Sequence, residues 1–251
     1  MKTILVASAL GGSGATTTAV RLAEAWLAEG RDVAVGELSA WPSASLITAD
    51  SRLKVRALPA PVSAAAARSL LKPLAGDVVL LDAARLDDPA LLHWVCACDA
   101  VLLVTRCDTF SLGAFSRTWP MLEALRAANP AMEFLGFLPT MVRPEEEASL
   151  RSLRMGAREH VLGHAIPMDP AESRRSQGAC FEGQEPLAPS MDLGSTAAHG
   201  ACAAELASRL QLPAPKPVAP AAPATTGLFT KLWSAAKRGA RLVATPGSAS
   251  A

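Results

Sequence analysis

A glycine-rich turn near the start of the chain reads Ala9-Leu10-Gly11-Gly12-Ser13-Gly14-Ala15-Thr16-Thr17-Thr18. An apolar run at 3–7 precedes it, and a helical pattern of apolar residues over 16–29 follows it. Strand, glycine turn and helix in this order are the setting of a phosphate-binding loop, in which backbone N–H groups and the start of the helix face an anion. A working loop of this kind continues G-K-[ST], and its lysine contacts the β- and γ-phosphates. Ala15 stands at the lysine position, so the turn has the form of a phosphate cradle without its main charge.

The loop resembles that of the ParA/MinD family of P-loop ATPases, whose pattern K-G-G-x-G-K-[ST]-T carries two lysines. Leu10 and Ala15 stand where the family has those lysines, while the glycines and threonines match. The resemblance therefore implies a degenerate nucleotide loop made of Gly11, Gly12, Ser13, Gly14, Ala15, Thr16 and Thr17. From the loop alone, a plain strand-to-helix turn with glycines for close packing is the alternative.

Other positions that the family uses for ATP chemistry are only partly kept. Four apolar residues end in Asp82, which matches the acid that holds Mg²⁺ in this family, so Thr16 and Asp82 form a possible Mg site. Where relatives usually carry D-x-D-P-Q, the chain reads Glu37-Leu38-Ser39, and the second acid, which positions the hydrolytic water, is missing. The resemblance thus implies a pseudo-ATPase rather than an enzyme, with at most weak affinity for ATP and Mg as cofactors.

The order of apolar and amphipathic segments predicts an α/β fold over residues 1–212. We expect a doubly wound, mostly parallel sheet of P-loop NTPase type, because strands alternate with helices and the first connection follows a glycine loop. The expected strands are 3–9, 32–38, 53–58, 77–82, 99–105, 134–139 and 164–169. The expected helices are 16–29, 62–75, 89–98, 111–127, 144–158 and a closing helix within 185–210.

Charge and cysteine content limit the classes of function. The chain of 251 residues has a formal net charge of +1, but residues 213–251 hold five Lys or Arg and no acid, so the body carries +1 minus +5, or −4. An acidic body argues against a nucleic-acid surface on it. The five cysteines form no C-x-x-C pair and are expected to be small buried hydrophobes in a reducing cytosol, not metal ligands. We expect neither a secretory leader nor a membrane-spanning run.

The basic end of the chain divides into three parts. A Pro/Ala linker is predicted over 213–226, an amphipathic helix over 227–243 and a disordered tail over 244–251. On a helical wheel the apolar residues, which include Leu228, Phe229, Leu232 and Trp233, separate without exception from the cations Lys231, Lys237, Arg238 and Arg241. These are the marks of a helix that lies in a membrane interface. A helix docked on a partner protein or on the acidic body is the open alternative.

Together, these features predict a ParA/MinD-like protein that acts in the positioning or assembly of a membrane-associated bacterial envelope system. Cellulose-secretion proteins of the BcsQ type and polar machinery are among the candidates. We expect a cytoplasmic protein, peripheral on the inner membrane face, that forms a homodimer or a heterodimer with another ParA/MinD-like or envelope protein. A slow ATPase with displaced catalytic groups and a nucleoid-binding partition protein remain as alternatives.

Overall fold

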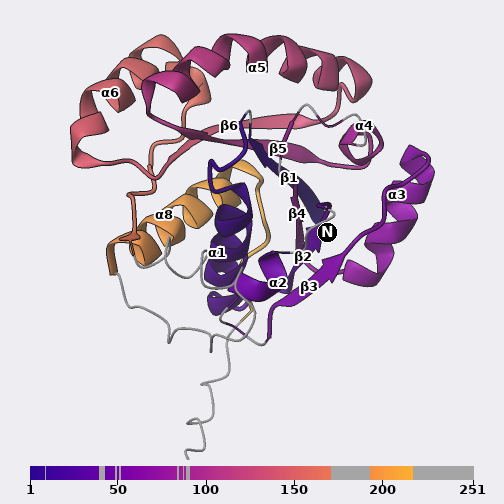
Figure 1. Ribbon diagram of the computed structural model, residues 1–251. Coiled ribbons are helices and arrows are strands. Elements are labelled where there is room, and N and C mark those ends of the chain that lie inside the picture. Colours follow the sequence, from indigo (N-terminus) through magenta and orange to yellow (C-terminus); the bar gives the residue numbers. More distant parts are fainter. Residues whose placement is uncertain are drawn as a thin grey trace, which may run out of the picture. The chain divides into compact units, whose positions relative to one another are not determined.

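A six-stranded, all-parallel sheet forms the centre of the computed structural model, in the order β3-β2-β4-β1-β5-β6 (Figure 1). The structure describes residues 1–8, 10–39, 43–48, 50, 52–83, 85–86, 88, 91–170 and 193–216. The strands are β1 (Lys2–Ser8), β2 (Val33–Glu37), β3 (Lys54–Ala57), β4 (Val78–Asp82), β5 (Ala100–Arg106) and β6 (Glu133–Thr140). This sheet confirms the predicted α/β fold of P-loop NTPase type.

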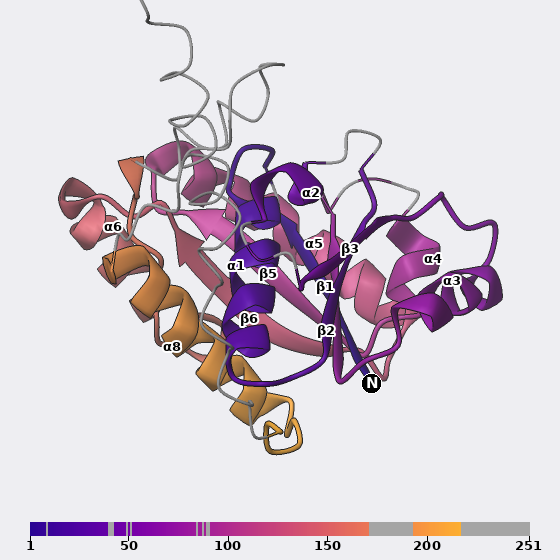
Figure 2. The ribbon, with the colours of Figure 1, turned by 90° about the horizontal axis from the view of Figure 1, so that it is seen from below.

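Side chains of the strands alternate between two helical layers. In β1, Ile4 and Val6 face one core, and Leu5 and Ala7 face the other, as successive residues of a strand must. Helices α1 (Ala15–Ala28) and α8 (Leu193–Arg209) cover the first face and run side by side in both views (Figures 1 and 2). The second face is covered by α3 (Ala64–Leu71), α4 (Leu91–Val95), α5 (Thr109–Ala128) and α6 (Glu147–Gly156).

The predicted strand over 164–169 is wrong in form, although the chain does run beside β6. Two isolated bridges, Phe137 to Val161 and Val142 to Pro167, replace a continuous ladder. Pro167 has no N–H to donate, which limits the pairing of a strand at this point. The segment still closes the outer edge of β6, because the N–H groups of Leu162 and Ile166 bond to carbonyls of that strand.

One helix boundary and one additional helix also differ from the prediction. The helix expected over 62–75 ends at Leu71 and tightens into a 3-10 helix, Lys72–Leu74, because Pro73 cannot continue the α-helical hydrogen bonds. A short helix, α2 (Ala44–Ile47), follows β2 and was not predicted from the sequence.

The interface between α1 and α8 joins a helix near the start of the chain to the last helix of the body. The buried Trp26 ring donates from Nε1 to the Ala203 carbonyl at 3.0 Å. At the end of α1, the guanidinium of the buried Arg31 donates to the carbonyl of Pro213. This bond fixes the start of the Pro/Ala linker beside the end of α1 that is remote from the glycine turn.

Within the described ranges, no helix is long and apolar enough to cross a membrane. The described cysteines, Cys96, Cys98, Cys107 and Cys202, are all free thiols, and burial raises the pKa of Cys107 to about 11. The predicted amphipathic helix over 227–243, the tail over 244–251 and all but the start of the linker lie outside the described residues.

Candidate functional site

The glycine turn connects β1 to α1 at the carboxyl edge of the sheet. Gly12 and Gly14 have φ angles of 77° and 81°, which only glycine adopts at little cost. Gly14 is the N-cap of α1, and it offers no side chain to the N–H groups of the first turn. The first turn also holds no acidic residue, so the partial positive charge of a 14-residue helix faces the turn uncompensated by its own side chains.

Hydrogen bonds occupy three carbonyls of the loop, those of Leu10, Ser13 and Gly14. The hydroxyls of Ser8 and Ser13 both donate to the Leu10 carbonyl at 2.8 Å. The hydroxyl of Thr140 donates to the Ser13 carbonyl at 2.7 Å, and the Thr18 N–H donates to the Gly14 carbonyl at 2.8 Å. With these carbonyls engaged by the protein, the loop is arranged to present N–H groups to a ligand.

Two buried carboxylates stand beside the loop on neighbouring strands. Glu37 and Asp82 are paired in the register of β2 and β4, and each is 2% exposed. Burial raises the pKa of Asp82 to about 6, a hydrogen bond from Thr16 opposes this, and the charge of Glu37 adds to it. The other carboxylate oxygen of Asp82, Oδ1, has no hydrogen-bond partner. Glu37 instead accepts the N–H of Ala44 at 2.5 Å and so also anchors the start of α2.

This arrangement suits the magnesium ion of a magnesium nucleotide, but it lacks the positive charge that the β- and γ-phosphates need. Thr16 and Asp82 supply the hydroxyl and the orphaned carboxylate oxygen that a hard divalent cation prefers. Ala15 is 6% exposed and provides no positive charge for a β- or γ-phosphate. Thr16 and Asp82 share a hydrogen bond, and their role as a magnesium site stays a prediction.

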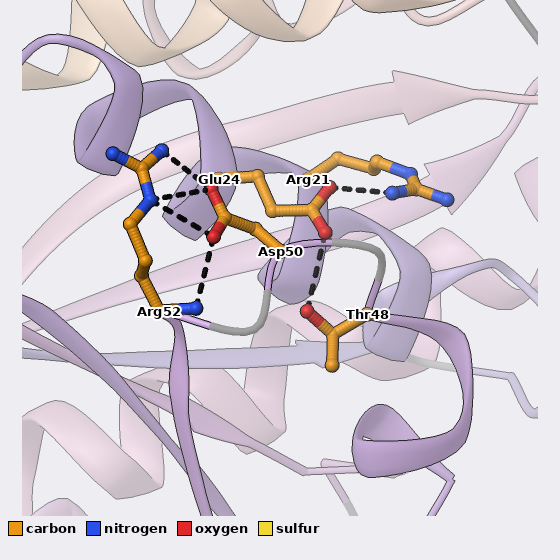
Figure 3. A network of polar contacts seen from close by, with 5 residues as sticks. All are labelled: Arg21, Glu24, Thr48, Asp50 and Arg52. Atoms are coloured by element: carbon orange, nitrogen blue, oxygen red, sulfur yellow. Dashed lines mark hydrogen bonds and ion pairs between the residues drawn. The ribbon is translucent and has the colours of Figure 1, made fainter. Parts of the chain in front are cut away.

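A polar network ties the connection between β2 and β3 to α1 (Figure 3). Glu24 on α1 accepts from Arg21 at 2.5 Å and from the Thr48 hydroxyl at 3.2 Å. Beyond Thr48, the guanidinium of Arg52 contacts both oxygens of Asp50, and this contact lowers the pKa of Asp50. The bond between Thr48 and Glu24 holds the end of α2 close to α1.

Sequence reasoning missed the parts of the site that come from β6 and from the end of β1. Thr140 and Ser8 bond to loop carbonyls, and the Met141 side chain lies over Gly14, where an added Cβ would be 3.1 Å from its Cε. A strand-terminal hydroxyl at the carboxyl edge of a parallel sheet was the available signal. It is weak, because a threonine at the end of a strand is common.

Neither a protein-family model nor a curated protein sequence matches this chain. Solved structures match it over most of its length. One is the MinC:MinD cell division protein complex of Aquifex aeolicus, with a TM-score of 0.65, 14% identity, and coverage of 87% of this chain and 98% of that chain. Another is the cell division ATPase MinD of Pyrococcus furiosus, with a TM-score of 0.61, 18% identity, and coverage of 83% and 99%. The chain has the MinD fold.

The MinD fold is not restricted to one activity. Cobyrinic acid a,c-diamide synthase of Mycobacterium smegmatis, solved with a bound ATP analog and magnesium, also matches, with a TM-score of 0.62, 18% identity, and coverage of 86% of this chain and 100% of that chain. Because identities are this low, the comparisons show the fold and the structural similarity to ParA/MinD ATPases. The particular function has to be argued from the site itself.

Proposed function

We propose that this protein is a MinD-like pseudo-ATPase that acts as a membrane-associated positioning or assembly factor for a bacterial envelope system, such as cellulose secretion or polar machinery. One observation supports the loss of hydrolysis above all others. Ala15, at the first position of α1, stands where the lysine of a working loop contacts the phosphates. Removal of a group that stabilises developing charge typically lowers the rate about 10²-fold or more.

Two further losses support the same reading. Leu10 replaces the second lysine of the ParA/MinD pattern, and Ser39 follows β2 where relatives carry the acid that positions water. The retained glycines, Thr16 and Asp82 preserve the shape of the site. We infer that the protein acts by binding to partner proteins and not by hydrolysis. It would do so as a homodimer or as a heterodimer with another ParA/MinD-like or envelope protein.

ATP turnover and Mg-ATP binding by the purified full chain test the loss of activity. We expect no turnover above the rate of a denatured control and at most weak binding by calorimetry. Ala15→Lys provides the internal comparison, because one charge-assisted hydrogen bond to phosphate corresponds to about 1.5–3 kcal/mol and so to at least a tenfold gain in affinity. Turnover by the wild-type protein at the rate of an active MinD-type enzyme would refute the proposal.

The membrane part of the proposal is based on the sequence of residues 227–243. Phe229, Leu232 and Trp233 share one side of the predicted helix, and its four cations share the other. Deletion of residues 227–251 is expected to release the protein from anionic liposomes in a flotation assay. Equal flotation of the truncated and the full chain would reject the membrane role and favour a protein partner.

A slow ATPase is the second candidate, and the geometry around Asp82 favours it. An orphaned carboxylate oxygen beside Thr16 is suited to a divalent cation, which an enzyme of this fold would need. Under this alternative, turnover is measurable in the wild type and is abolished in Asp82→Asn. A nucleoid-binding role is disfavoured by the −4 charge of residues 1–212, and a mobility-shift assay on nonspecific DNA at low salt would reveal it.

A further inference from the structure

The last residue of β6 reaches the glycine loop from across the sheet. Thr140 is buried, and its hydroxyl oxygen lies 2.7 Å from the Ser13 carbonyl oxygen and 3.2 Å from that of Thr105. A hydroxyl has one proton, so it donates mainly to one of the two carbonyls. The shorter distance identifies the Ser13 carbonyl as the main acceptor. The bond joins residues that are 127 positions apart in the sequence, and it attaches the loop to the outer strand of the sheet.

The direction of this bond determines where the loop's N–H groups point. The carbonyl of Ser13 and the N–H of Gly14 belong to one planar trans peptide, so they point in opposite directions. Because the hydrogen bond holds the Ser13 carbonyl toward Thr140, the Gly14 N–H points away from Thr140. The Ser8 and Ser13 hydroxyls fix the N–H of Gly11 in the same way, because they hold the Leu10 carbonyl.

Met141 supports the loop from the same strand end. Its φ angle of 52° lies in the left-handed region, which a residue with a side chain rarely adopts. In that conformation its Cε lies over Gly14, 3.1 Å from the place of an added Cβ. Strained residues of this kind persist where the surrounding structure enforces them, and they cluster at functional sites.

The buried Asp82 indicates which anion this loop suits. Its unpartnered Oδ1, beside Thr16, disfavours a bare anion and favours one that brings a divalent cation. A phosphate-class anion with Mg²⁺ meets both requirements, because the N–H groups of the loop would donate to the phosphate oxygens and the carboxylate would coordinate the cation.

We propose that Thr140 is a positioning residue for the glycine loop. Its hydroxyl holds the loop in the N–H-inward form before a ligand binds, so that the loop takes a magnesium-bound phosphate-class anion through backbone N–H groups and without a lysine. The inference rests on the proposed function, since it concerns the same degenerate loop.

Backbone dynamics of the full chain test the positioning role without a ligand. Order parameters of the Gly12 and Gly14 amides are expected near 0.85 in the wild type and below about 0.6 in Thr140→Val, which lacks the hydroxyl but keeps the shape. Thr140→Ser restores the hydroxyl and is expected to match the wild type. Thr105→Val is the matched control, because Thr105 is the next-to-last residue of β5, is 7% exposed, and donates its hydroxyl to the Arg106 carbonyl and not to the loop.

Binding of magnesium pyrophosphate, followed by the same amide signals, tests the consequence for the ligand. The dissociation constant is expected to rise about fivefold to tenfold in Thr140→Val, and to stay unchanged in Thr140→Ser and Thr105→Val. Should Thr140→Val fail to fold, Thr140→Ala must show the same loosening and the same loss of affinity. Unchanged order parameters in the valine or alanine variant would overturn the positioning role. Unchanged amide signals of the wild type on addition of magnesium pyrophosphate would overturn the choice of ligand.

Failure of this inference is distinguishable from failure of the proposed function. ATP turnover by the wild type would refute the pseudo-ATPase while leaving the role of Thr140 intact. A rigid loop in Thr140→Val would refute the role of Thr140 while leaving the pseudo-ATPase intact.

Discussion

At the scale of single residues, Asp82 dominates the energetics of the site. Its folded pKa of about 6 lies above the unfolded value of about 3.9, so between these pH values the folded state holds a proton that the unfolded chain releases. Stability from this group is fully present below the unfolded pKa and is lost as the pH rises through 6. A shift of about two units corresponds to about 3 kcal/mol, as an order of magnitude.

Asp82→Asn is therefore expected to stabilise the protein at pH 8 and to leave its stability nearly unchanged at pH 4. The amide resembles the protonated acid in shape and charge, so the gain at pH 8 is about 1–3 kcal/mol and vanishes where Asp82 itself is neutral. Urea unfolding at the two pH values measures the difference. Glu133→Gln, an exposed carboxylate-to-amide substitution at the start of β6, serves as the control, and a change in stability within about 0.5 kcal/mol is expected. A variant that is less stable than the wild type at pH 8 would contradict the buried, charged state.

The sequence predicted the strand, turn and helix around the glycine loop, because these belong to a local pattern. The pairing of Thr16 with Asp82 as a magnesium site was implied by the family resemblance and stays a prediction. It did not predict the contacts of Thr140 and Met141, which bring together residues more than a hundred positions apart. Nor did it reveal that Glu37 anchors α2, since the bond from Ala44 depends on a short helix with a weak local signal. Long-range contacts of ordinary residue types leave no trace in one sequence.

At the scale of elements, the junction of the glycine turn with α1 depends on the backbone conformation of Gly14. Gly14→Ala places a side chain at φ 81° and within 3.1 Å of Met141, so a loss of about 1–2 kcal/mol is expected. Gly113→Ala is the opposite control, because that glycine lies inside α5 with open space around its Cα and alanine is the better helix former, by about 0.5–1 kcal/mol. Chemical denaturation measures the change in the free energy of unfolding, which is expected to fall in Gly14→Ala and to rise in Gly113→Ala. A stabilising Gly14→Ala would show that the turn does not need its left-handed glycine.

The packing of α1 against α8 gives a second prediction at this scale. Trp26 is fully buried and donates to Ala203, so Trp26→Ala removes a large side chain and its hydrogen bond and is expected to cost about 3–5 kcal/mol. Leu92→Ala on α4 removes a side chain that is 47% exposed, and a cost within about 1 kcal/mol is expected. Urea midpoints compare the two. Equal losses would indicate that α8 does not form part of the cooperative core.

Element order was predictable from the sequence because each buried parallel strand is a short apolar run. Boundaries failed where proline changes the hydrogen bonding, at Pro73 after α3 and at Pro167 beside β6. The register of β6 includes a bulge at which Gly136, with a φ of 120°, lies against the His160 carbonyl. Such irregularities come from tertiary contacts and are invisible in the periodicity.

At the scale of the whole molecule, the glycine turn and the start of the Pro/Ala linker lie at opposite ends of α1. The glycine turn precedes Ala15, and the linker starts at Pro213, which Arg31 holds just beyond the other end of the helix. A helix of 14 residues is about 20 Å long. An anion bound at the loop would therefore lie about one helix length away from Pro213.

The final prediction concerns the charge of that basic end. Each of the four cations in residues 227–243 contributes about 1 kcal/mol near an anionic surface, so replacing Lys231, Lys237, Arg238 and Arg241 with glutamine is expected to weaken binding to phosphatidylserine vesicles about 10³-fold. The same binding is expected to fall steeply between 0.1 M and 0.5 M salt, because screening shortens the reach of the surface potential. Leu232→Ala with Trp233→Ala is the companion variant, and it is expected to weaken binding at all salt concentrations, since apolar insertion is not screened. Vesicle co-sedimentation across lipid composition and salt measures both terms. Binding that is equally tight to neutral phosphatidylcholine, or unaffected by the glutamine variant, would contradict an electrostatic attachment.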